Sequence, residues 1–287
     1  MSGANHPDKF AVLGHPISHS LSPVMHQASF RALDYNAIYL PFDVAPDKLG
    51  GVLPAMRDMG FKGINLTIPL KEVAYDLLAD LHDDARRLGA VNTVEITADG
   101  GLRGHNTDSY GFLRALDESF AISPTGMRIL LLGCGGAGRT VAITSAMRGA
   151  SEVVLADVDV QRSAALAVEI EQLGCAADIS CISNDKSEWE AAASQSHLIV
   201  QATPVGMNPE DPSLLDAKVF HGGQYVLDLI YMYPATPIMK AAAQSGAKTA
   251  NGIGMLLHQG AHAFTIWTGR QADTDAMRGA LEQAVYG

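Results

Sequence analysis

The sequence predicts an α/β protein of two domains, each built from strands that alternate with helices. Three observations predict this class. Segments with strand-like and helix-like apolar spacing alternate along both halves of the chain, which is typical of mostly parallel sheets with helical crossovers. A glycine-rich motif separates a strand from a helix in the second half. The length of 287 residues also exceeds the roughly 100 to 200 residues of a usual single domain.

The elements of the first half follow from short apolar runs and the turn residues between them. We expect strands at 10–13, 38–44 and 64–68, and helices at 25–35, 48–60 and 70–78. Gly14 and the stretch HPISHSLSP form the first loop. Asp99-Gly100-Gly101 predicts a hairpin, because Asp and Gly tolerate a positive φ. The hairpin ends at a polar corner, His105 to Asp108.

The second half repeats the alternation from Arg128 onward. We expect strands at 129–133, 153–158, 198–203 and 225–230, a helix at 138–149 and a long amphipathic helix that ends at Gly174. Ser, Pro and Thr collect at 119–125, so the boundary is expected there. The predicted domains are 1–120 and 121–251. Helices within 252–287 are expected to return to the first domain, because apolar residues with helical spacing lie beyond the last strand of the second.

Composition excludes several classes of protein. With 47% hydrophobic and 18% charged residues, the chain has the composition of a globular enzyme. A net charge of −11 without any basic run argues against a nucleic-acid partner. No apolar run approaches the roughly 18 residues of a membrane helix, and the first ten residues do not resemble a secretory signal. We therefore expect a cytoplasmic protein that binds a small molecule and no membrane.

Cysteine and histidine spacing does not indicate a metal. The three cysteines form no C-x-x-C pair and are expected to be reduced. His15, His19 and His26 cluster near the first loop without a recognisable ligand spacing. His258 and His262 flank Gln259 and are expected to pack or hydrogen-bond. No metal is predicted.

Residues 133–139 read GCGGAGR and directly follow an expected strand. Three glycines match G-x-G-x-x-G: one makes a tight turn, one lets the backbone approach a pyrophosphate, and one lets the helix pack on the strand. Between a strand and a helix, this motif predicts a Rossmann dinucleotide-binding domain. The alternative is a turn that only joins strand to helix. The candidate loop residues are Gly133, Gly135, Gly136, Ala137, Gly138 and Arg139.

Asp157 ends the next strand, about 20 positions after Gly138, where an acidic residue is expected to accept hydrogen bonds from a ribose. The alternative is that Asp157 caps the following helix. Asp159 is a comparable candidate for that cap, so the two roles can be divided between them.

Polar side chains gather in four stretches of the first half: SHSLSP, NLTIPLK, GAVNT and GHNTD. Loops at the carboxyl ends of parallel strands are where α/β proteins collect ligand contacts, so we expect these stretches to converge. Each residue also has a plainer interpretation. Lys71 can be a solvated lysine in a first helical turn, Ser20 and Ser22 can cap a helix, and Asn92 and Asp108 can be turn formers.

These stretches, together with GCGGAGR and NGIGMLLHQGAHAF, resemble the motifs of the shikimate dehydrogenase family in order and spacing, over nearly the whole chain. The resemblance implies an N-terminal substrate domain, a Rossmann domain and NAD(P)-dependent oxidation of shikimate to 3-dehydroshikimate. It implies that Lys71 transfers the proton with Asp108 as its partner. It places Ser20, Ser22 and Tyr231 at the substrate carboxylate, Thr67, Asn92, Asp108 and Gln259 at the ring hydroxyls, and Thr203, Gly254 and Met255 along the nicotinamide.

The cofactor stretch departs from the family pattern. Members that use NADP typically resemble N-R-T-x-x-R after the second strand of the dinucleotide domain, whereas this chain has DVDVQR at 157–162. Asp157 favours NAD, because a carboxylate repels a 2′-phosphate, while Arg162 is retained. A dual quinate/shikimate dehydrogenase is the close alternative, although Ser22 keeps the shikimate pattern. A non-catalytic sensor of the metabolite or dinucleotide is a further alternative. The family includes monomers and homodimers.

Overall fold

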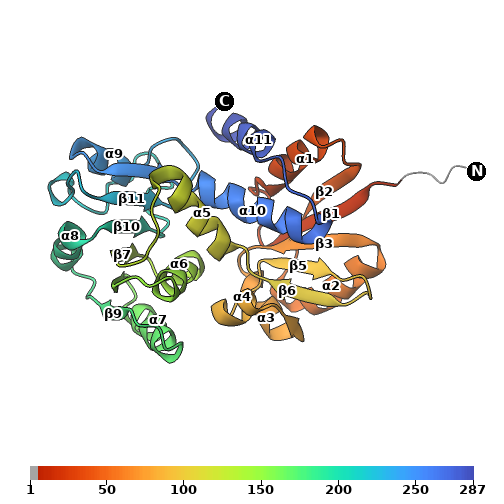
Figure 1. Cartoon of the computed structure of the whole chain (residues 1–287), viewed down its shortest axis with the longest axis horizontal. Coiled ribbons are helices and arrows are strands. Elements are labelled where there is room, and N and C mark those ends of the chain that lie inside the picture. The colour runs from red at the N-terminus through yellow and green to blue at the C-terminus, as the bar shows by residue number, and fades with distance from the viewer. Residues whose placement is uncertain (1–5) are drawn as a thin grey trace, which may run out of the picture. The chain divides into compact units, whose positions relative to one another are not determined.

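The computed structural model describes residues 6–287, and these form two compact units (Figure 1). The first unit extends to Gly111 and resumes at Leu257–Val285, and the second covers Phe112–Leu256. Two helices carry the chain from one unit into the other, because α5 (Asp108–Phe120) and α10 (Ile253–Thr268) each contain a unit boundary. Each unit has its own six-stranded sheet.

The sheet of the first unit is mixed, in the order β2-β1-β3-β5-β6-β4. Its strands are β1 (Asp8–Gly14), β2 (Ala37–Asp43), β3 (Phe61–Leu66), β4 (Asp80–Leu81), β5 (Thr93–Ile96) and β6 (Leu102–His105). β1 runs parallel to β2 and β3, and β4 runs parallel to β6. β5 is antiparallel to both β3 and β6. The hairpin prediction is therefore confirmed, and Gly100 at its turn has a φ of +83°.

Three helices of the first unit, at 22–32, 49–58 and 70–77, start and stop within three residues of the expected bounds, whereas β4, α5 and the helix at 83–88 were not expected from the sequence. The helices of this unit are α1 (Ser22–Ala32), α2 (Leu49–Asp58), α3 (Leu70–Leu77), α4 (Asp83–Leu88) and α11 (Thr274–Tyr286), besides parts of α5 and α10. α1 begins earlier than its apolar spacing suggests because Pro23 suits a first helical turn, and it stops before Asp34, whose φ is +48°. β3 ends at Leu66 rather than at 68, since the chain turns there and the Leu70 N–H donates to the Thr67 carbonyl.

The carboxyl-terminal half of α10 packs on the sheet of the first unit. The Trp267 ring stacks on Phe10 at a centroid distance of 5.3 Å, and its indole N–H donates to the Val94 carbonyl at 3.0 Å. The fit is close, because a Cβ at Gly63 would lie 2.3 Å from the Trp267 ring. The last part of the chain therefore completes the core of the first unit.

The second unit is a parallel sheet in the order β12-β11-β10-β7-β8-β9. Its strands are β7 (Arg128–Leu132), β8 (Glu152–Ala156), β9 (Asp178–Cys181), β10 (Leu198–Gln201), β11 (Tyr225–Asp228) and β12 (Lys248–Asn251), and its own helices are α6 (Gly136–Met147), α7 (Val160–Gln172), α8 (Lys186–Gln195) and α9 (Pro237–Gln244). With β7 as the first strand, this is the 3-2-1-4-5-6 order of a Rossmann fold. The predicted fold class is confirmed.

Four elements of the second unit were not expected from the sequence: β9, α8, α9 and β12. β9 and β12 are the two edge strands, and neither contains a fully buried residue. Because a strand at the edge is less buried, its sequence needs no continuous apolar run, and that run is the signal by which the central strands were predicted. Among residues 6–287, no helix is both long enough and apolar enough to span a membrane.

Candidate active site

The glycine loop follows β7 at the point where the strand order reverses, since β7 pairs with β8 on one side and β10 on the other. Gly133 has a φ of +96°, and a Cβ there would lie 2.9 Å from the Ala202 carbonyl carbon. A Cβ at Gly138 would lie 1.9 Å from the Gly133 oxygen, so only glycine lets α6 approach the strand. In contrast, a Cβ at Gly135 would meet no atom within 4 Å, which leaves open space before the first turn of α6. These are the separate roles that the motif predicts.

Two other predicted cofactor segments adjoin strand ends of the same sheet. Thr203 follows β10, and its methyl group would lie 2.9 Å from a Cβ at Gly133, so Thr203 flanks the glycine loop. Its N–H donates to the Gln201 side chain at 2.6 Å, and its hydroxyl accepts the Val205 N–H at 3.1 Å. Gly254 and Met255 lie in the first turn of α10, where the Asn251 side chain accepts the Ile253 N–H at 3.2 Å.

Asp157 and Asp159 divide their roles. Asp159 is the N-cap of α7, and its carboxylate accepts the Gln161 and Arg162 N–H groups. Asp157 does not cap this helix. It is 4% exposed, and its two oxygens accept the backbone N–H groups of Cys134, at 2.7 Å, and Asp159, at 2.8 Å. Asp157 therefore ties the end of β8 to the glycine loop.

The two arginines predicted at the cofactor are both paired with carboxylates. Arg162 is 3.5 Å from an oxygen of Asp157 and 3.4 Å from an oxygen of Asp159, and about half of its side chain is exposed. Arg139 forms a two-pronged ion pair with Glu169 of α7, with an Nε–Oε2 distance of 2.9 Å. Sequence reasoning had no signal for this partner, because Glu169 lies 30 positions away on another helix.

The polar stretches of the first unit meet along one side of its sheet, where β1, β3 and β6 end and β5 begins. Ser20 and Ser22 follow the carboxyl end of β1, while Thr67 and Lys71 follow that of the neighbouring parallel strand β3. Asn92 directly precedes β5, which is antiparallel to β3, and Asp108 follows β6, which is antiparallel to β5. The topology therefore brings strand ends of both directions to the same side of the sheet.

Lys71 and Asp108 form an ion pair at that side of the sheet, with an Nζ–Oδ2 distance of 2.7 Å. The exposed fractions of their side chains are 28% and 11%, so the pair is largely shielded from water. The other Asp108 oxygen accepts the amide of Asn92 at 2.9 Å. The Asp108 backbone N–H donates to the side chain of Asn106 at 3.0 Å, which holds the first residue of α5. The simple interpretations of Lys71 as solvated and of Asn92 as a turn former are wrong for this arrangement.

Asn92 is the centre of a buried hydrogen-bond network. It is 2% exposed, and its side-chain nitrogen also donates to the Thr107 hydroxyl at 2.9 Å and to the side-chain oxygen of Gln259 at 3.4 Å. Its amide oxygen accepts the Thr107 N–H at 2.8 Å and the Thr93 hydroxyl at 2.9 Å. Gln259 is in α10, so the network joins the predicted motif of the last helices to this side of the sheet.

Sequence reasoning missed the residues that support this network. Tyr39 donates to Asn65 at 2.6 Å, and Asn65 donates to the Asn92 carbonyl at 3.1 Å and to the Thr93 hydroxyl at 3.0 Å. Asn65, Thr93 and Thr107 each lie within a polar stretch that the sequence singled out. The stretches were the available signal, but residue spacing does not reveal which members face the site and which hold them.

The remaining predicted substrate residues are found in different settings. The Ser20 hydroxyl accepts the N–H of Ser22, the first residue of α1, at 3.3 Å, although the N-cap residue itself is Leu21, which makes no side-chain cap. Thr67 packs against Gly14, where a Cβ would lie 2.5 Å from its methyl group. Tyr231 belongs to the second unit, and burial raises the pKa of its phenol.

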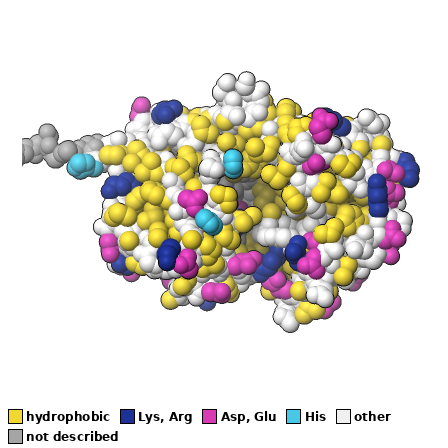
Figure 2. All heavy atoms as spheres, turned by 180° about the vertical axis from the view of Figure 1, so that it is seen from behind, with side chains coloured by type: hydrophobic (Ala, Val, Ile, Leu, Met, Phe, Trp, Pro, Cys, Tyr) yellow, Lys and Arg dark blue, Asp and Glu magenta, His cyan; other side chains and the backbone are white. Residues whose placement is uncertain are grey.

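The surface charge is dispersed. On the face shown in Figure 2, Lys and Arg side chains are interspersed with acidic, hydrophobic and uncharged groups and form no large basic patch. With a net charge of −11, the chain as a whole repels anions. An anionic ligand therefore has to be held by local donors.

The second unit is a Rossmann unit whose glycine loop is shaped for a dinucleotide. The first unit of the same chain holds a shielded Lys–Asp pair within a network of amides and hydroxyls. Together these features define an NAD(P)-dependent oxidoreductase. Residues 12–94 match the family model described as the shikimate dehydrogenase substrate binding domain, and residues 252–282 match the shikimate 5′-dehydrogenase C-terminal domain. A shikimate dehydrogenase (NADP(+)) from Methanopyrus kandleri is 43% identical over 94% of this chain and 93% of its own length. The chain belongs to the shikimate dehydrogenase family, which confirms the sequence resemblance.

Solved structures agree with this assignment. Shikimate 5-dehydrogenase from Listeria monocytogenes, in complex with shikimate and NAD, superposes with a TM-score of 0.90 at 31% identity and covers 97% of both chains. Quinate dehydrogenase from Corynebacterium glutamicum, in complex with NAD, superposes with a TM-score of 0.89 at 31% identity, covering 97% of this chain and all of its own. The family therefore includes proteins solved with NAD as well as relatives named for NADP.

Proposed function

We propose that this protein is a shikimate dehydrogenase that prefers NAD, and that it catalyses the reversible oxidation of shikimate to 3-dehydroshikimate. The observation that carries the proposal is the shielded Lys71–Asp108 pair, 2.7 Å apart and held by Asn92, in a chain that matches shikimate dehydrogenases over nearly its full length. The domain at 1–120, completed by 252–287, would bind the substrate, and 121–251 would bind the dinucleotide.

The proposed mechanism moves a proton and a hydride from the same alcohol. The bound nicotinamide supplies the hydride acceptor when shikimate is oxidised and the hydride donor in the reverse direction. During oxidation the neutral amine of Lys71 takes the proton of the substrate hydroxyl and becomes the ammonium; during reduction the ammonium gives that proton to the carbonyl oxygen. Asp108 holds Nζ in place and accepts a hydrogen bond from the substrate. Asn92 fixes the second Asp108 oxygen, so the carboxylate keeps one orientation.

Substrate recognition would use neutral groups. Ser20, Ser22 and Tyr231 are proposed to donate to the substrate carboxylate, which suits a chain that repels anions at long range. Thr67, Asn92, Asp108 and Gln259 are proposed to bind the ring hydroxyls. An amide can both donate and accept, so Asn and Gln suit a polyol.

The NAD preference rests on the charges around Arg162. Its guanidinium has a carboxylate on each side, Asp157 and Asp159, within 3.5 Å. A 2′-phosphate would face both carboxylates, and it would have to displace them from Arg162. The ribose of NAD has a hydroxyl at that position, which can donate to Asp157. The glycine loop, Gly133, Gly135, Gly136, Ala137, Gly138 and Arg139, would surround the pyrophosphate, and Thr203, Gly254 and Met255 would line the nicotinamide.

The direct test is a steady-state assay of the purified protein with shikimate and with quinate, each with NAD and with NADP, followed by nicotinamide absorbance. We expect shikimate with NAD to have the highest kcat/KM, and Asp108→Asn to lower it strongly. Lys62→Ala, at an exposed lysine of the same unit, is the matched control and should not change turnover. A higher kcat/KM for quinate would make the protein a dual or quinate enzyme. Binding of shikimate without turnover would identify a sensor and reject the proposal.

A further inference from the structure

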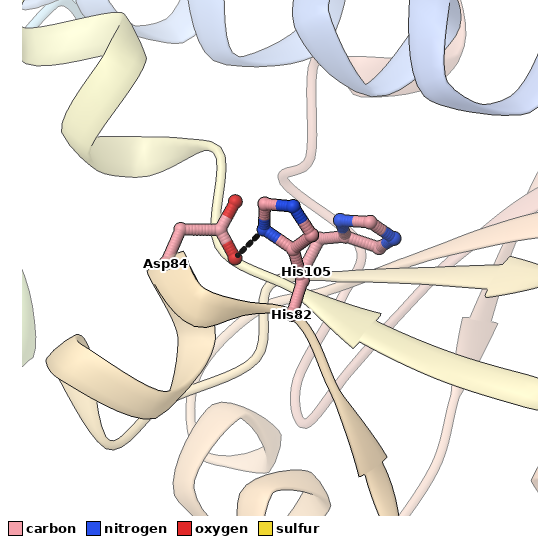
Figure 3. A group of neighbouring side chains, drawn as sticks. All are labelled: His82, Asp84 and His105. Carbon is pink, nitrogen blue, oxygen red and sulfur yellow. Dashed lines mark ion pairs between the residues drawn. The ribbon is translucent and has the colours of Figure 1, made fainter.

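Two histidines and an aspartate converge next to the side of the sheet that carries the Lys71–Asp108 pair. His82 follows β4 and is the N-cap of α4, Asp84 lies in the first turn of α4, and His105 is the last residue of β6. One potential ligand atom from each residue lies within 4.8 Å of the other two. Figure 3 shows the three side chains meeting, with Asp84 pointing toward the His82 ring and the His105 ring on its other side.

His105 is oriented by a carboxylate of its own. Its Nε2 is 2.9 Å from Oε2 of Glu95, and its side chain is only 8% exposed. A carboxylate oxygen accepts, so Nε2 is the ring nitrogen that donates to Glu95, and Nδ1 is the nitrogen that remains to bind a ligand. A histidine ligand commonly donates its second ring N–H to a carboxylate in this way, which fixes the ring and raises its basicity.

Asp84 and His82 are also arranged as ligands. Backbone N–H groups of Ala85, at 2.5 Å, and Asn106, at 3.2 Å, donate to Oδ1 of Asp84 and set its side chain. His82 Nδ1 lies 3.1 Å from the same oxygen. The two imidazole rings stack with a centroid distance of 4.9 Å. A simple His82–Asp84 surface pair would account for one ring, but it would leave the second ring and the Glu95 contact unexplained.

We propose that His82, Asp84 and His105 bind one divalent transition-metal cation of the zinc class, with water completing the coordination. Imidazole and carboxylate ligands suit zinc, and three protein ligands with an open position form a common zinc geometry. Bonds of about 2.0 to 2.1 Å place tetrahedral ligand atoms roughly 3.3 Å apart, so the most widely separated atoms of the cluster, up to 4.8 Å apart, must approach each other by up to about 1.5 Å. His82 is the member free to move, because 54% of its side chain is exposed while His105 is held by Glu95.

The site would act on the catalytic pair through the backbone. Asp84 Oδ1 accepts the Asn106 N–H, and the Asn106 side chain accepts the Asp108 N–H at 3.0 Å. A cation that draws Asp84 toward itself would therefore also shift Asn106, and Asn106 holds the backbone of Asp108 in position. We expect the cation to link β4, α4 and β6 and to change turnover without entering the chemical step.

The test is metal binding by the full chain after removal of metals with a chelator. Zinc titrated by calorimetry should bind in a single equivalent, and cobalt should produce the intense visible absorption of a four-coordinate site. His82→Ala should lower the affinity at least tenfold, and Glu95→Gln by about 10- to 100-fold, since it removes only the carboxylate that orients His105. His221→Ala, at an exposed histidine of the second unit, is the matched control and should bind zinc as the unmodified chain does.

Zinc should also raise the melting temperature of the unmodified chain but not that of His82→Ala, because a ligand stabilises only the state that it binds. Absence of saturable zinc binding would overturn the proposal, as would equal affinity in the His82→Ala variant. These readouts do not use shikimate or a dinucleotide, so they stand apart from the proposed dehydrogenase activity.

Discussion

At the scale of single residues, the site depends on Asp108, whose side chain and backbone are both held in one orientation. Lys71 takes one carboxylate oxygen, Asn92 takes the other, and Asn106 fixes the backbone N–H. Asp108 also begins α5, where the helix dipole favours a negative charge. The lysine therefore faces a carboxylate that is oriented before any substrate binds, which is the preorganisation that proton transfer requires.

Lys71→Ala should lower kcat by about 10²- to 10⁴-fold and leave shikimate binding nearly unchanged, because the lysine acts mainly in the transition state. Steady-state kinetics and equilibrium titration with shikimate would measure the two effects separately. Lys62→Ala provides the surface-lysine control. A Lys71→Ala enzyme with the original kcat would remove this lysine from the mechanism.

Ser20→Ala and Ser22→Ala should act mainly on KM for shikimate. A carboxylate is bound alike in the ground and transition states, and uniform binding does not alter kcat. A hydrogen bond to a charged group contributes about 1.5 to 3 kcal/mol, which corresponds to roughly tenfold or more in KM. Since neither serine is the N-cap of α1, the melting temperature should change little. Unchanged KM values in both variants would assign the carboxylate to other donors.

At the scale of elements, the turn between β8 and α7 combines a structural and a selective role. Asp159 caps α7, and Asp157 holds the glycine loop through the Cys134 N–H. Val158 between them is 76% exposed. The same two carboxylates that build the turn also occupy Arg162, so cofactor selectivity and local stability rest on shared atoms.

The double variant Val158→Arg with Asp159→Thr should shift the preference from NAD toward NADP. Arginine at 158 adds a cation at an exposed position, and threonine removes a carboxylate while still capping α7. The measurement is kcat/KM for both cofactors at saturating shikimate. Val168→Arg, which adds a cation at an exposed position farther along α7, is the control. If the unmodified enzyme already favours NADP, the argument from Asp157 and Asp159 fails.

At the scale of the whole molecule, each of the two units has its own hydrophobic core, and the second unit also contains a buried acid. Asp228 ends β11 with no exposed surface, and it accepts the Ile230 N–H at 3.0 Å and the Thr236 hydroxyl at 2.6 Å. Burial raises the pKa of its carboxyl to about 6, although both hydrogen bonds lower it. The folded state therefore binds this proton more tightly than the unfolded chain does.

Asp228 makes the protein less stable as the pH rises. The contribution of Asp228 to stability is fully present below the unfolded pKa of about 4, and it is lost as the pH rises to about 6. Asp228→Asn should remove this loss, because the Thr236 hydroxyl can accept from the new amide. Above pH 6 the variant should be more stable by about 1 to 3 kcal/mol, and the difference should shrink toward pH 4. Urea unfolding across pH 4 to 8 would measure it, with the exposed Asp58→Asn as control. A difference that does not vary with pH would contradict the assignment.

Much of the second unit could be predicted because its signals are local. The buried strands β7, β8, β10 and β11 are short apolar runs, and the glycine loop and the Asp159 cap each involve neighbours within a few residues. The edge strands β9 and β12 could not be predicted, since their burial depends on partners elsewhere in the sheet. In the first unit, the polar stretches identified the right region for the same local reason.

The sequence by itself determined the α/β class, the glycine loop, the hairpin and the family, because each depends on residue types at short fixed spacings. Only the tertiary structure decided which polar residues meet: Lys71 with Asp108, Arg139 with Glu169, and His105 with both Glu95 and His82. These pairs are separated by 10 to 37 positions in the chain. Their contacts arise from strand order and register, which apolar spacing along one segment does not encode.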